Sequence, residues 1–257
     1  MVLRSPHEPK GPLNIQRSQQ GRPVVFQAGS SESGRAFAAS SCDAIFISAR
    51  NFDEARSISD DLRRRAEENG RDPDGLVILC GAYFMVEDSL ADAEAEFEKY
   101  ASGVPIGDAL KRLGRLFGYH DFSVYPLDSP FPDLGGLGAN GFQTFTSRVI
   151  NDAREHGLTL RQTALSYATP RSSFIGTPET VADEVERWVN EGAVDGFMLF
   201  GPPDLTNLKH VSRVLPVLKQ RGLFRSEYET TTLRGHLGLD VPVNRYSAQF
   251  DRPQPAR

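Results

Sequence analysis

The chain has 257 residues, a net charge of −5 at pH 7 and 39% apolar residues, a composition typical of a soluble α/β protein. No apolar run approaches the ~18 residues of a membrane span, no basic patch is interleaved with aromatic residues, and residues 1–6 lack the apolar core of a signal peptide. These features argue against membrane, nucleic-acid and exported classes and predict a cytoplasmic location. Cys42 and Cys80 have no metal-ligand spacing and are expected to be small buried thiols.

The first predicted βα unit follows a polar segment, residues 1–22, and holds the most informative motif. An apolar strand over residues 24–28 ends at Ala28 and leads through the turn Gly29-Ser30-Ser31 into a helix over residues 32–41. Such a turn brings a flexible glycine, two hydroxyl groups and the free N–H groups of a helix start together, which favours phosphate binding. Ser31 is also the expected N-cap, and capping without a ligand is the alternative interpretation.

Two further buried strands are predicted, over residues 44–48 and within residues 76–86. The helix between them carries Arg63, Arg64 and Arg65 among acidic residues. A solvated helix face is the simpler interpretation of this triplet, and phosphate binding is the alternative. An acidic helix is expected over residues 89–100, with its carboxylates in solvent rather than around a metal.

Residues 101–173 are predicted to form a long insertion with helical pattern around Leu113 and over residues 142–156. Connections in βα units are usually short, so an insertion of this size indicates a lid or binding element. Its stretch Gly136-Leu137-Gly138-Ala139-Asn140-Gly141 matches the dinucleotide-binding pattern G-x-G-x-x-G. Because no apolar strand precedes this stretch, we interpret it as a flexible loop.

The last βα unit has the clearest local signals. Thr177 is the expected N-cap and Pro178 the first residue of a helix whose apolar stripe includes Trp188, which we assign to the core. A strand follows over residues 196–200, and the final helix is expected to bury Leu208 among other apolar residues. None of the five histidines is flanked by a nucleophile or carboxylate in a hydrolase pattern, so no Ser-His-Asp arrangement is predicted.

Several separate motifs occur in an order that resembles one known family. They are Gly11-Pro12-Leu13-Asn14, Gln27-Ala28-Gly29-Ser30-Ser31, Tyr125-Pro126-Leu127-Asp128, Gly176-Thr177-Pro178-Glu179, Gly192-Ala193-Val194-Asp195-Gly196-Phe197, Arg221-Gly222-Leu223-Phe224-Arg225 and Thr232-Leu233-Arg234-Gly235-His236-Leu237-Gly238-Leu239. Together they resemble the nitrilotriacetate and dibenzothiophene-sulfone monooxygenase branch of the bacterial-luciferase-like, flavin-dependent monooxygenases.

Members of that family are longer (β/α)8 barrels, and this sequence resembles only their C-terminal part. The resemblance therefore implies an α/β fold: the C-terminal half of a (β/α)8 TIM barrel, with about four parallel βα units and a long helical insertion before the last strand. We expect one partial domain over residues 1–257. Its segments would be a lead-in (1–22), βα units (23–100), the insertion (101–173), the last βα unit (174–222) and a tail (223–257).

The resemblance also implies a function. A complete enzyme of this kind would take reduced FMN from a separate NAD(P)H-dependent flavin reductase and use O2 to oxygenate a small organic substrate. Ser30 and Ser31, with Gly29 and Ala28 shaping the turn, match the family's phosphate-binding motif, whereas the catalytic groups would lie in the N-terminal half. A homo-oligomer without metal, membrane or nucleic acid is expected. The alternative is a non-catalytic remnant or interaction module, and the substrate, whether nitrilotriacetate-like, a sulfone or an alkane, cannot be predicted.

Overall fold

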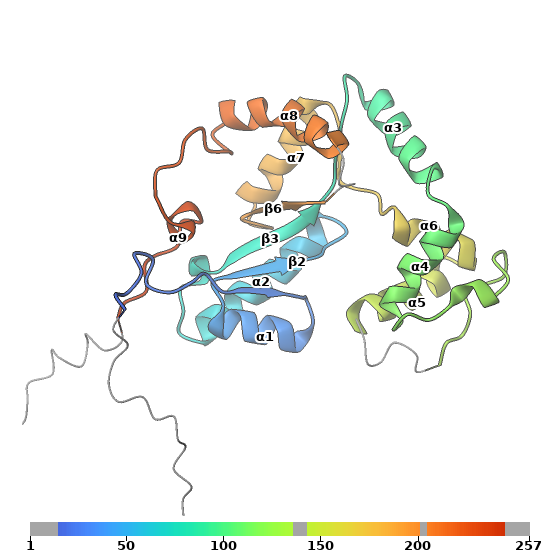
Figure 1. Cartoon of the computed structure of the whole chain (residues 1–257), viewed down its shortest axis with the longest axis horizontal. Coiled ribbons are helices and arrows are strands. Elements are labelled where there is room, and N and C mark those ends of the chain that lie inside the picture. Colours follow the sequence, from blue (N-terminus) through green and yellow to red (C-terminus); the bar gives the residue numbers. More distant parts are fainter. Residues whose placement is uncertain (1–14, 136–142, 201–204, 245–257) are drawn as a thin grey trace, which may run out of the picture. The chain divides into compact units, whose positions relative to one another are not determined.

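The computed structural model describes residues 15–135, 143–200 and 205–244 (Figure 1). Within these residues four parallel strands form one sheet in the order β1-β2-β3-β6. Their bounds are Phe26–Ala28 (β1), Ala44–Ile47 (β2), Val77–Ala82 (β3) and Gly196–Leu199 (β6). The predicted α/β class and its four parallel strands are confirmed. Strands this rich in β-branched and aromatic residues are typical of a parallel sheet with helical crossovers.

Four helices cover one face of this sheet. They are α1 (Glu32–Ser41), α2 (Phe52–Glu68), α7 (Pro178–Asn190) and α8 (Leu205–Gln220), with a short 3-10 turn, η1 (Pro73–Gly75), before β3. Alternate strand residues such as Ile45, Ile47 and Ile78 point into the core beneath these helices. Trp188 lies in the same core, as predicted, and packs against the rings of Phe174 and Phe197.

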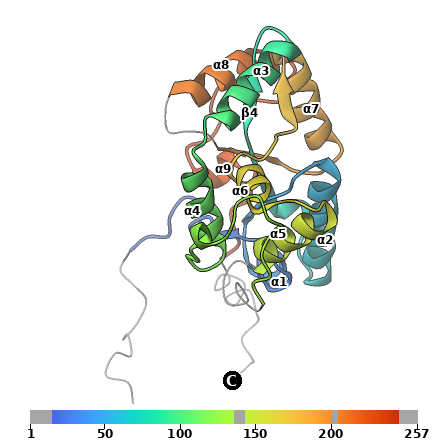
Figure 2. The same cartoon turned by 90° about the vertical axis from the view of Figure 1, so that its right-hand side faces the viewer.

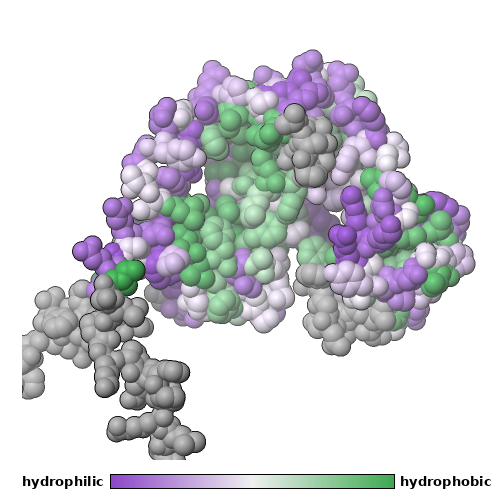
Figure 3. All heavy atoms as spheres, viewed as in Figure 1, coloured by the Kyte–Doolittle hydropathy of each residue, from purple (hydrophilic) through white to green (hydrophobic). Residues whose placement is uncertain are grey.

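The opposite face of the sheet, which we call the open sheet face, carries Phe26, Phe46, Met198 and Phe200. Phe26 is 46% exposed, Met198 42% and Phe200 41%, and Figure 3 shows hydrophobic residues gathered over the sheet on this side. Phe200 lies over Gly81, where an added Cβ would come within 2.4 Å of its ring, and packs edge-on against Phe46 at 5.7 Å. Parallel sheets usually have both faces covered, so this face is unusual.

A second, two-stranded parallel sheet differs from the sequence prediction. Tyr83 separates β3 from β4 (Phe84–Val86), which pairs with β5 (Phe174–Gly176). The single strand predicted within residues 76–86 is therefore two strands, and β5 was not predicted at all. Three residues are too few to show a period-2 pattern, and their burial comes from contacts distant in sequence. Helix α3 (Leu90–Ser102) starts one residue later than predicted, with Ser89 as its N-cap.

The insertion forms its own small core. Helices α4 (Ile106–Leu116), α5 (Gln143–Glu155) and α6 (Leu160–Ala168) lie together with the 3-10 turn η2 (Phe122–Val124) (Figures 1 and 2). Leu113, Phe117, Phe122, Val149 and Leu160 are buried between them. The first two helices agree with the predicted pattern, whereas α6 was missed although Thr159 and Gln162 form a capping box at its start. The glycine-rich stretch 136–141 lies outside the described residues.

Helix α8 differs from the prediction at Leu208. Leu208 was expected in the core but is 63% exposed, whereas His210 and Val214 are buried. The reason is a polar contact: the His210 Nδ1 accepts a hydrogen bond from the Val86 backbone N–H at 3.0 Å, which sets the rotation of the helix. An apolar pattern alone could not show that a histidine belongs inside.

Residues 15–24 and 228–244 belong to a second compact unit. It contains the short helix α9 (Leu233–His236), capped by Thr232. The buried Arg234 donates hydrogen bonds to the backbone oxygens of Pro23 and Asp240, both at 3.4 Å, which joins the two chain segments of this unit. Among the described helices of the whole chain, we find none that combines the length and apolar character needed to cross a membrane.

Candidate functional site

All four strands of the main sheet run in the same direction, so the segments that follow them meet at one edge, which we call the carboxyl edge. The turn Gly29–Ser31 follows β1, and residues 48–51 follow β2. Tyr83 follows β3 and Phe200 follows β6, and their rings lie 5.8 Å apart. Ligands of parallel α/β sheets bind at this edge, which makes it the candidate site. Residues 201–204, between β6 and α8, lie outside the described residues.

The serine turn, Gly29–Ser31, connects β1 to α1 with the geometry that the sequence predicts. Gly29 has φ of +126°, a conformation that L side chains rarely adopt, and its N–H donates to Phe46 O at 3.2 Å. Ser31 is the N-cap of α1, and its Oγ accepts from the Gly34 N–H at 3.2 Å. The Ser31 hydroxyl hydrogen remains able to donate, and the first N–H groups of α1 have no partner inside the helix.

Gly34 contributes to this turn, although sequence reasoning gave it no role. A Cβ at this position would lie 3.0 Å from Ser31 Oγ and 3.2 Å from Gly29 O. The absence of a side chain therefore lets the first turn of α1 close tightly on the strand end. A glycine three residues after a serine N-cap is the sequence signal that could have indicated this.

The charge beside the serine turn is balanced by an ion-pair network. Glu32 in the first turn of α1 pairs with Arg65 at 2.6 Å and with Arg35 at 3.5 Å, and Arg35 pairs with Asp61 at 2.8 Å. The pKa of the Asp61 carboxyl is lowered overall. Burial alone would raise this pKa, but the hydrogen bonds to Arg65 and Arg64 and the attraction to Arg35 have the larger effect. With Glu32 neutralised by two guanidinium groups, the helix start can accept an anion.

The arginine triplet, Arg63 to Arg65, is only in part the solvated face that the sequence indicates, because Arg64 is exposed whereas Arg63 and Arg65 are largely covered. Arg63 donates to Gly192 O at 2.7 Å and pairs with Asp195 at 3.0 Å, just before β6 begins. Arg65 is half-buried against Asp61. Arg63 thus contacts the edge of the sheet opposite to the serine turn. All three guanidinium groups have carboxylate partners, so phosphate binding by this triplet loses its support.

A second charged network links the insertion to the carboxyl edge. Arg50, which follows β2, donates to both carboxylate oxygens of Asp152 on α5 at 3.0 and 2.9 Å. Tyr167 on α6 donates to the same carboxylate at 2.7 Å, and Arg148 on α5 pairs with Glu54 on α2. Burial, followed by the hydrogen bond to Asp152, raises the pKa of the Tyr167 phenol. The Arg50–Asp152 and Arg148–Glu54 partners lie 102 and 94 positions apart, and no local sequence signal indicated them.

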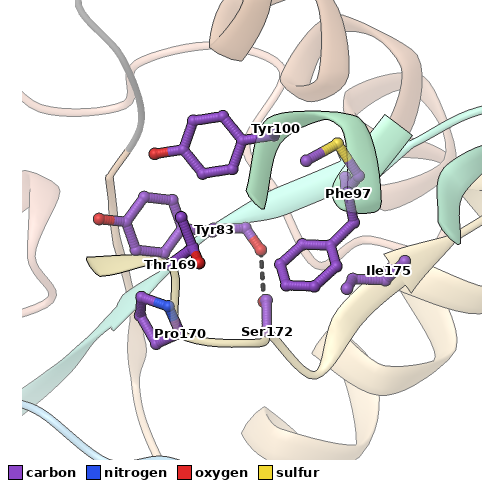
Figure 4. A pocket seen from close by; sticks show the side chains of 8 residues that line it. Tyr83, Phe97, Tyr100, Thr169, Pro170, Ser172 and Ile175 are labelled. Atoms are coloured by element: carbon purple, nitrogen blue, oxygen red, sulfur yellow. Dashed lines mark hydrogen bonds between the residues drawn. The ribbon is translucent and has the colours of Figure 1, made fainter. Parts of the chain in front are cut away.

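A small pocket of about 20 Å³ lies beside the carboxyl edge (Figure 4). We call it the tyrosine pocket. It is lined by Tyr83, Met85, Phe97, Tyr100, Thr169, Pro170, Ser172 and Ile175. Ser172 Oγ donates to the Tyr83 backbone oxygen and accepts from the Phe174 N–H at 3.1 Å, which fixes one wall. Burial, as the largest influence, raises the pKa of the Tyr83 phenol.

The remaining candidate residues do not form a reactive group. His120 Nε2 lies 3.1 Å from the Tyr125 hydroxyl in the insertion, and Cys42 and Cys80 are buried, as predicted. Among the described residues no cluster of three or more His, Cys, Asp or Glu is placed to hold a metal. The described carboxyl edge therefore offers a serine turn at a helix start and a small apolar pocket.

Comparison with known proteins gives this geometry a context. The family model for luciferase-like monooxygenases matches residues 3–195. The chain is 37% identical over 242 residues to N-acetyl-S-(2-succino)cysteine monooxygenase of Bacillus subtilis (strain 168), covering 93% of this chain and 55% of that protein. It is 38% identical over 240 residues to nitrilotriacetate monooxygenase component A of Aminobacter aminovorans, covering 91% and 52%. The chain thus spans about half the length of the curated relatives it matches.

Solved structures agree with the sequence comparison. DmoA from Hyphomicrobium sulfonivorans superposes with a TM-score of 0.74 and 29% identity, covering 97% of this chain and 57% of that one. A riboflavin lyase, RcaE, solved with modified FMN and riboflavin, gives a TM-score of 0.72 and 27% identity over 93% of this chain and 54% of that one.

Proposed function

The chain belongs to the luciferase-like monooxygenase family, and we propose that it supplies the phosphate-binding half of an FMN-dependent monooxygenase site. The observation that carries this proposal is the serine turn at the carboxyl edge of a parallel sheet. Its positive-φ glycine, two hydroxyl groups and helix N-terminus suit the phosphate of FMN. The neutralised Glu32 removes the nearest charge that would repel that phosphate.

In this proposal the chain's own residues bind and orient the cofactor. Ser30 and Ser31 donate to the phosphate oxygens, while Gly29 and Ala28 shape the turn that holds them. Bound FMN, supplied in reduced form by a separate NAD(P)H-dependent reductase, provides the reaction with O2 that oxygenates a small organic substrate. The two-component arrangement is suggested by the name of the Aminobacter relative, component A.

The insertion takes the second role, which is to cover the site and exclude water. The Arg50–Asp152 contact holds α5 at the carboxyl edge, and Tyr83 continues that edge into the pocket. A site covered in this way protects reactive species from water.

We further propose that the site is completed by βα units that this chain does not contain. Relatives are about twice as long, and the open sheet face leaves Phe26, Met198 and Phe200 41–46% exposed. Four more units would close the sheet into a barrel and contribute the catalytic groups. The same exposed face favours the second candidate, an interaction module that binds another chain without catalysis.

Phosphorus-31 NMR of FMN mixed with the chain tests the anion site directly. We expect the unmodified chain to broaden the FMN phosphate signal. Ser30→Ala should weaken the apparent affinity for FMN ~10–100-fold, because a lost charge-assisted hydrogen bond costs about 1.5–3 kcal/mol. Riboflavin, which lacks the phosphate, should bind equally to both proteins. Absence of any FMN signal change in the unmodified chain would favour the interaction module.

Capping must be separated from binding at Ser31. Asparagine and aspartate both cap helices well, so neither Ser31→Asn nor Ser31→Asp should lower the melting temperature. Only aspartate places a negative charge at the phosphate position, and two unit charges ~4 Å apart near a protein surface repel by about 4 kcal/mol. Ser31→Asp should therefore abolish FMN binding, whereas Thr177→Asp, the same change at the N-cap of α7, should not. Equal loss in both aspartate variants would refute the assignment.

A further inference from the structure

We propose that a cleft in the insertion binds an aromatic carboxylate, at a site separate from the serine turn. The cleft lies between α4 and residues 119–123, the turn that leads from α4 into η2, and we call it the insertion cleft. Its volume of about 490 Å³ falls within the ~300–1,000 Å³ range of small-molecule sites. The described lining residues all belong to the insertion, so binding here requires neither the serine turn nor FMN.

Two glycines of α4 border the insertion cleft and keep it open. A Cβ at Gly107 would meet no atom of another described element within 4 Å, so the cleft reaches the helix backbone there. A Cβ at Gly114 would collide with His120 O, so only a glycine lets the following turn pack directly against the helix. Leu110 and Phe122 belong to the core of the insertion and contribute the apolar floor. A floor this close to the backbone leaves room for a planar ring.

Tyr119 lines the same cleft in a backbone conformation that is unfavourable for a bulky residue. Its φ is +65°, next to Gly118 at +69°, and the residue is 82% exposed. The Tyr119 N–H donates to Gly114 O at 2.8 Å, which fixes this left-handed turn at the end of α4. An aromatic side chain is thus held in solvent where asparagine or glycine would fit with less strain. Its ring is available to pack against an aromatic ligand.

The charges of the insertion cleft favour a ligand with a single anionic group. Lys111 pairs with Asp108 at 3.3 Å, whereas Arg115, one helical turn further along α4, has no hydrogen-bond or ion-pair partner among the described residues. Asp121, the one carboxylate among the described lining residues, accepts from the Ser123 N–H and Oγ at 2.9 and 2.7 Å. The guanidinium of Arg115 can therefore bind one carboxylate through two hydrogen bonds. A second carboxylate on the ligand would find no free guanidinium and would be repelled by Asp121.

Fluorine NMR with para-trifluoromethylbenzoate and the full chain tests the proposal. The probe signal should broaden or shift in a saturable manner. The uncharged counterpart, para-trifluoromethylbenzyl alcohol, should bind about three- to tenfold more weakly, because it cannot pair with a guanidinium that is open to solvent. Arg115→Gln should weaken benzoate binding by the same factor and leave alcohol binding unchanged. Arg154→Gln is the matched control, because Arg154 is an exposed arginine of α5 that does not line the cleft.

Two further variants separate the insertion cleft from other apolar surfaces. Gly107→Phe fills the cleft and should weaken benzoate binding at least tenfold, whereas Val124→Phe on η2 and Met198→Ala on the open sheet face should not. Tyr119→Asn should weaken binding several-fold without lowering the urea midpoint, because asparagine adopts positive φ more readily than tyrosine. This variant keeps the test decisive should Gly107→Phe fail to fold.

Three results would overturn the proposal. They are the absence of any saturable probe signal, equal affinity for the benzoate and the alcohol, and a loss of binding in the control variants as large as in the cleft variants. Because the lining includes no residue of the serine turn, a failure of FMN binding would count against the proposed function and leave this inference unaffected.

Discussion

Replacing Met198 by lysine should turn a self-associating chain into a monomer. Met198 lies on the open sheet face of β6, an edge strand, and is 42% exposed, so the substitution removes little from the folded core. An open parallel sheet with an apolar face and two free edge strands is a template for association. The added charge would have to be buried in any contact that covers this face.

The exposed fractions of Phe26, Met198 and Phe200 give the size of the effect. Each of these side chains has an accessible area of ~200 Å² when fully exposed, and nearly half of that area is exposed in the structure. Together the three side chains therefore leave about 250 Å² of apolar surface in water. Burying this area on both copies of a symmetric dimer contributes about 12 kcal/mol, at about 25 cal/mol per Å². Association costs at least about 4 kcal/mol, so a dimer with a Kd in the micromolar range is expected. Met198→Lys removes about 2 kcal/mol from each copy, which weakens the dimer at least ~100-fold.

Sedimentation velocity across the micromolar range is the appropriate assay. The unmodified chain should change its sedimentation coefficient with concentration, and Met198→Lys should not. Val124→Lys, on η2 of the insertion, is the control because Val124 is 70% exposed and lies away from the sheet. The reasoning fails if the unmodified chain sediments as a monomer throughout, or if Val124→Lys disrupts association as strongly as Met198→Lys.

Three further predictions concern stability and are measured by urea unfolding. Gly29→Ala should cost ~1 kcal/mol or more, because alanine cannot easily adopt φ of +126°, whereas Gly107→Ala in α4 should not destabilise the chain. Tyr167→Phe should cost about 1.5–3 kcal/mol by removing a hydrogen bond to the Asp152 carboxylate, and no change would show that water replaces it. Asp61, whose pKa is lowered on folding, stabilises the fold above its unfolded pKa of about 3.9 and loses this contribution as the pH falls through the folded value. Asp61→Asn should therefore destabilise at pH 7 and have little effect near pH 2; an equal loss at both pH values would contradict the ionic origin.

Elements with strong local signals were predictable from the sequence. The serine cap of α1 and the Thr177-Pro178 start of α7 depend on backbone conformation and hydrogen bonds among residues close in sequence. The structure places both helices at the predicted residues. The strands of the main sheet are buried on at least one side and rich in β-branched residues, so their pattern is visible without knowledge of their neighbours.

Features set by distant contacts were not predictable. Strand β5 exists because β4 pairs with it, and His210 is buried because the Val86 backbone offers it a hydrogen bond. The tyrosine pocket likewise combines residues from β4, α3 and the segment after α6, which no sequence window contains together. The serine turn was identified as a candidate site because a strand end, a glycine and a cap follow one another along the chain.

The insertion is joined to the rest of its unit in a way that suits a covering element. Its apolar core is separate from the core under the sheet, and α5 is held to α2 and the end of β2 by Arg50, Glu54, Arg148 and Asp152. Partly exposed ion pairs are individually weak and are screened by salt, whereas each apolar core is stabilised by burial. The charged contact can therefore open without unfolding either core. An element that must admit a substrate and then exclude water needs this combination of a firm interior and a weak attachment.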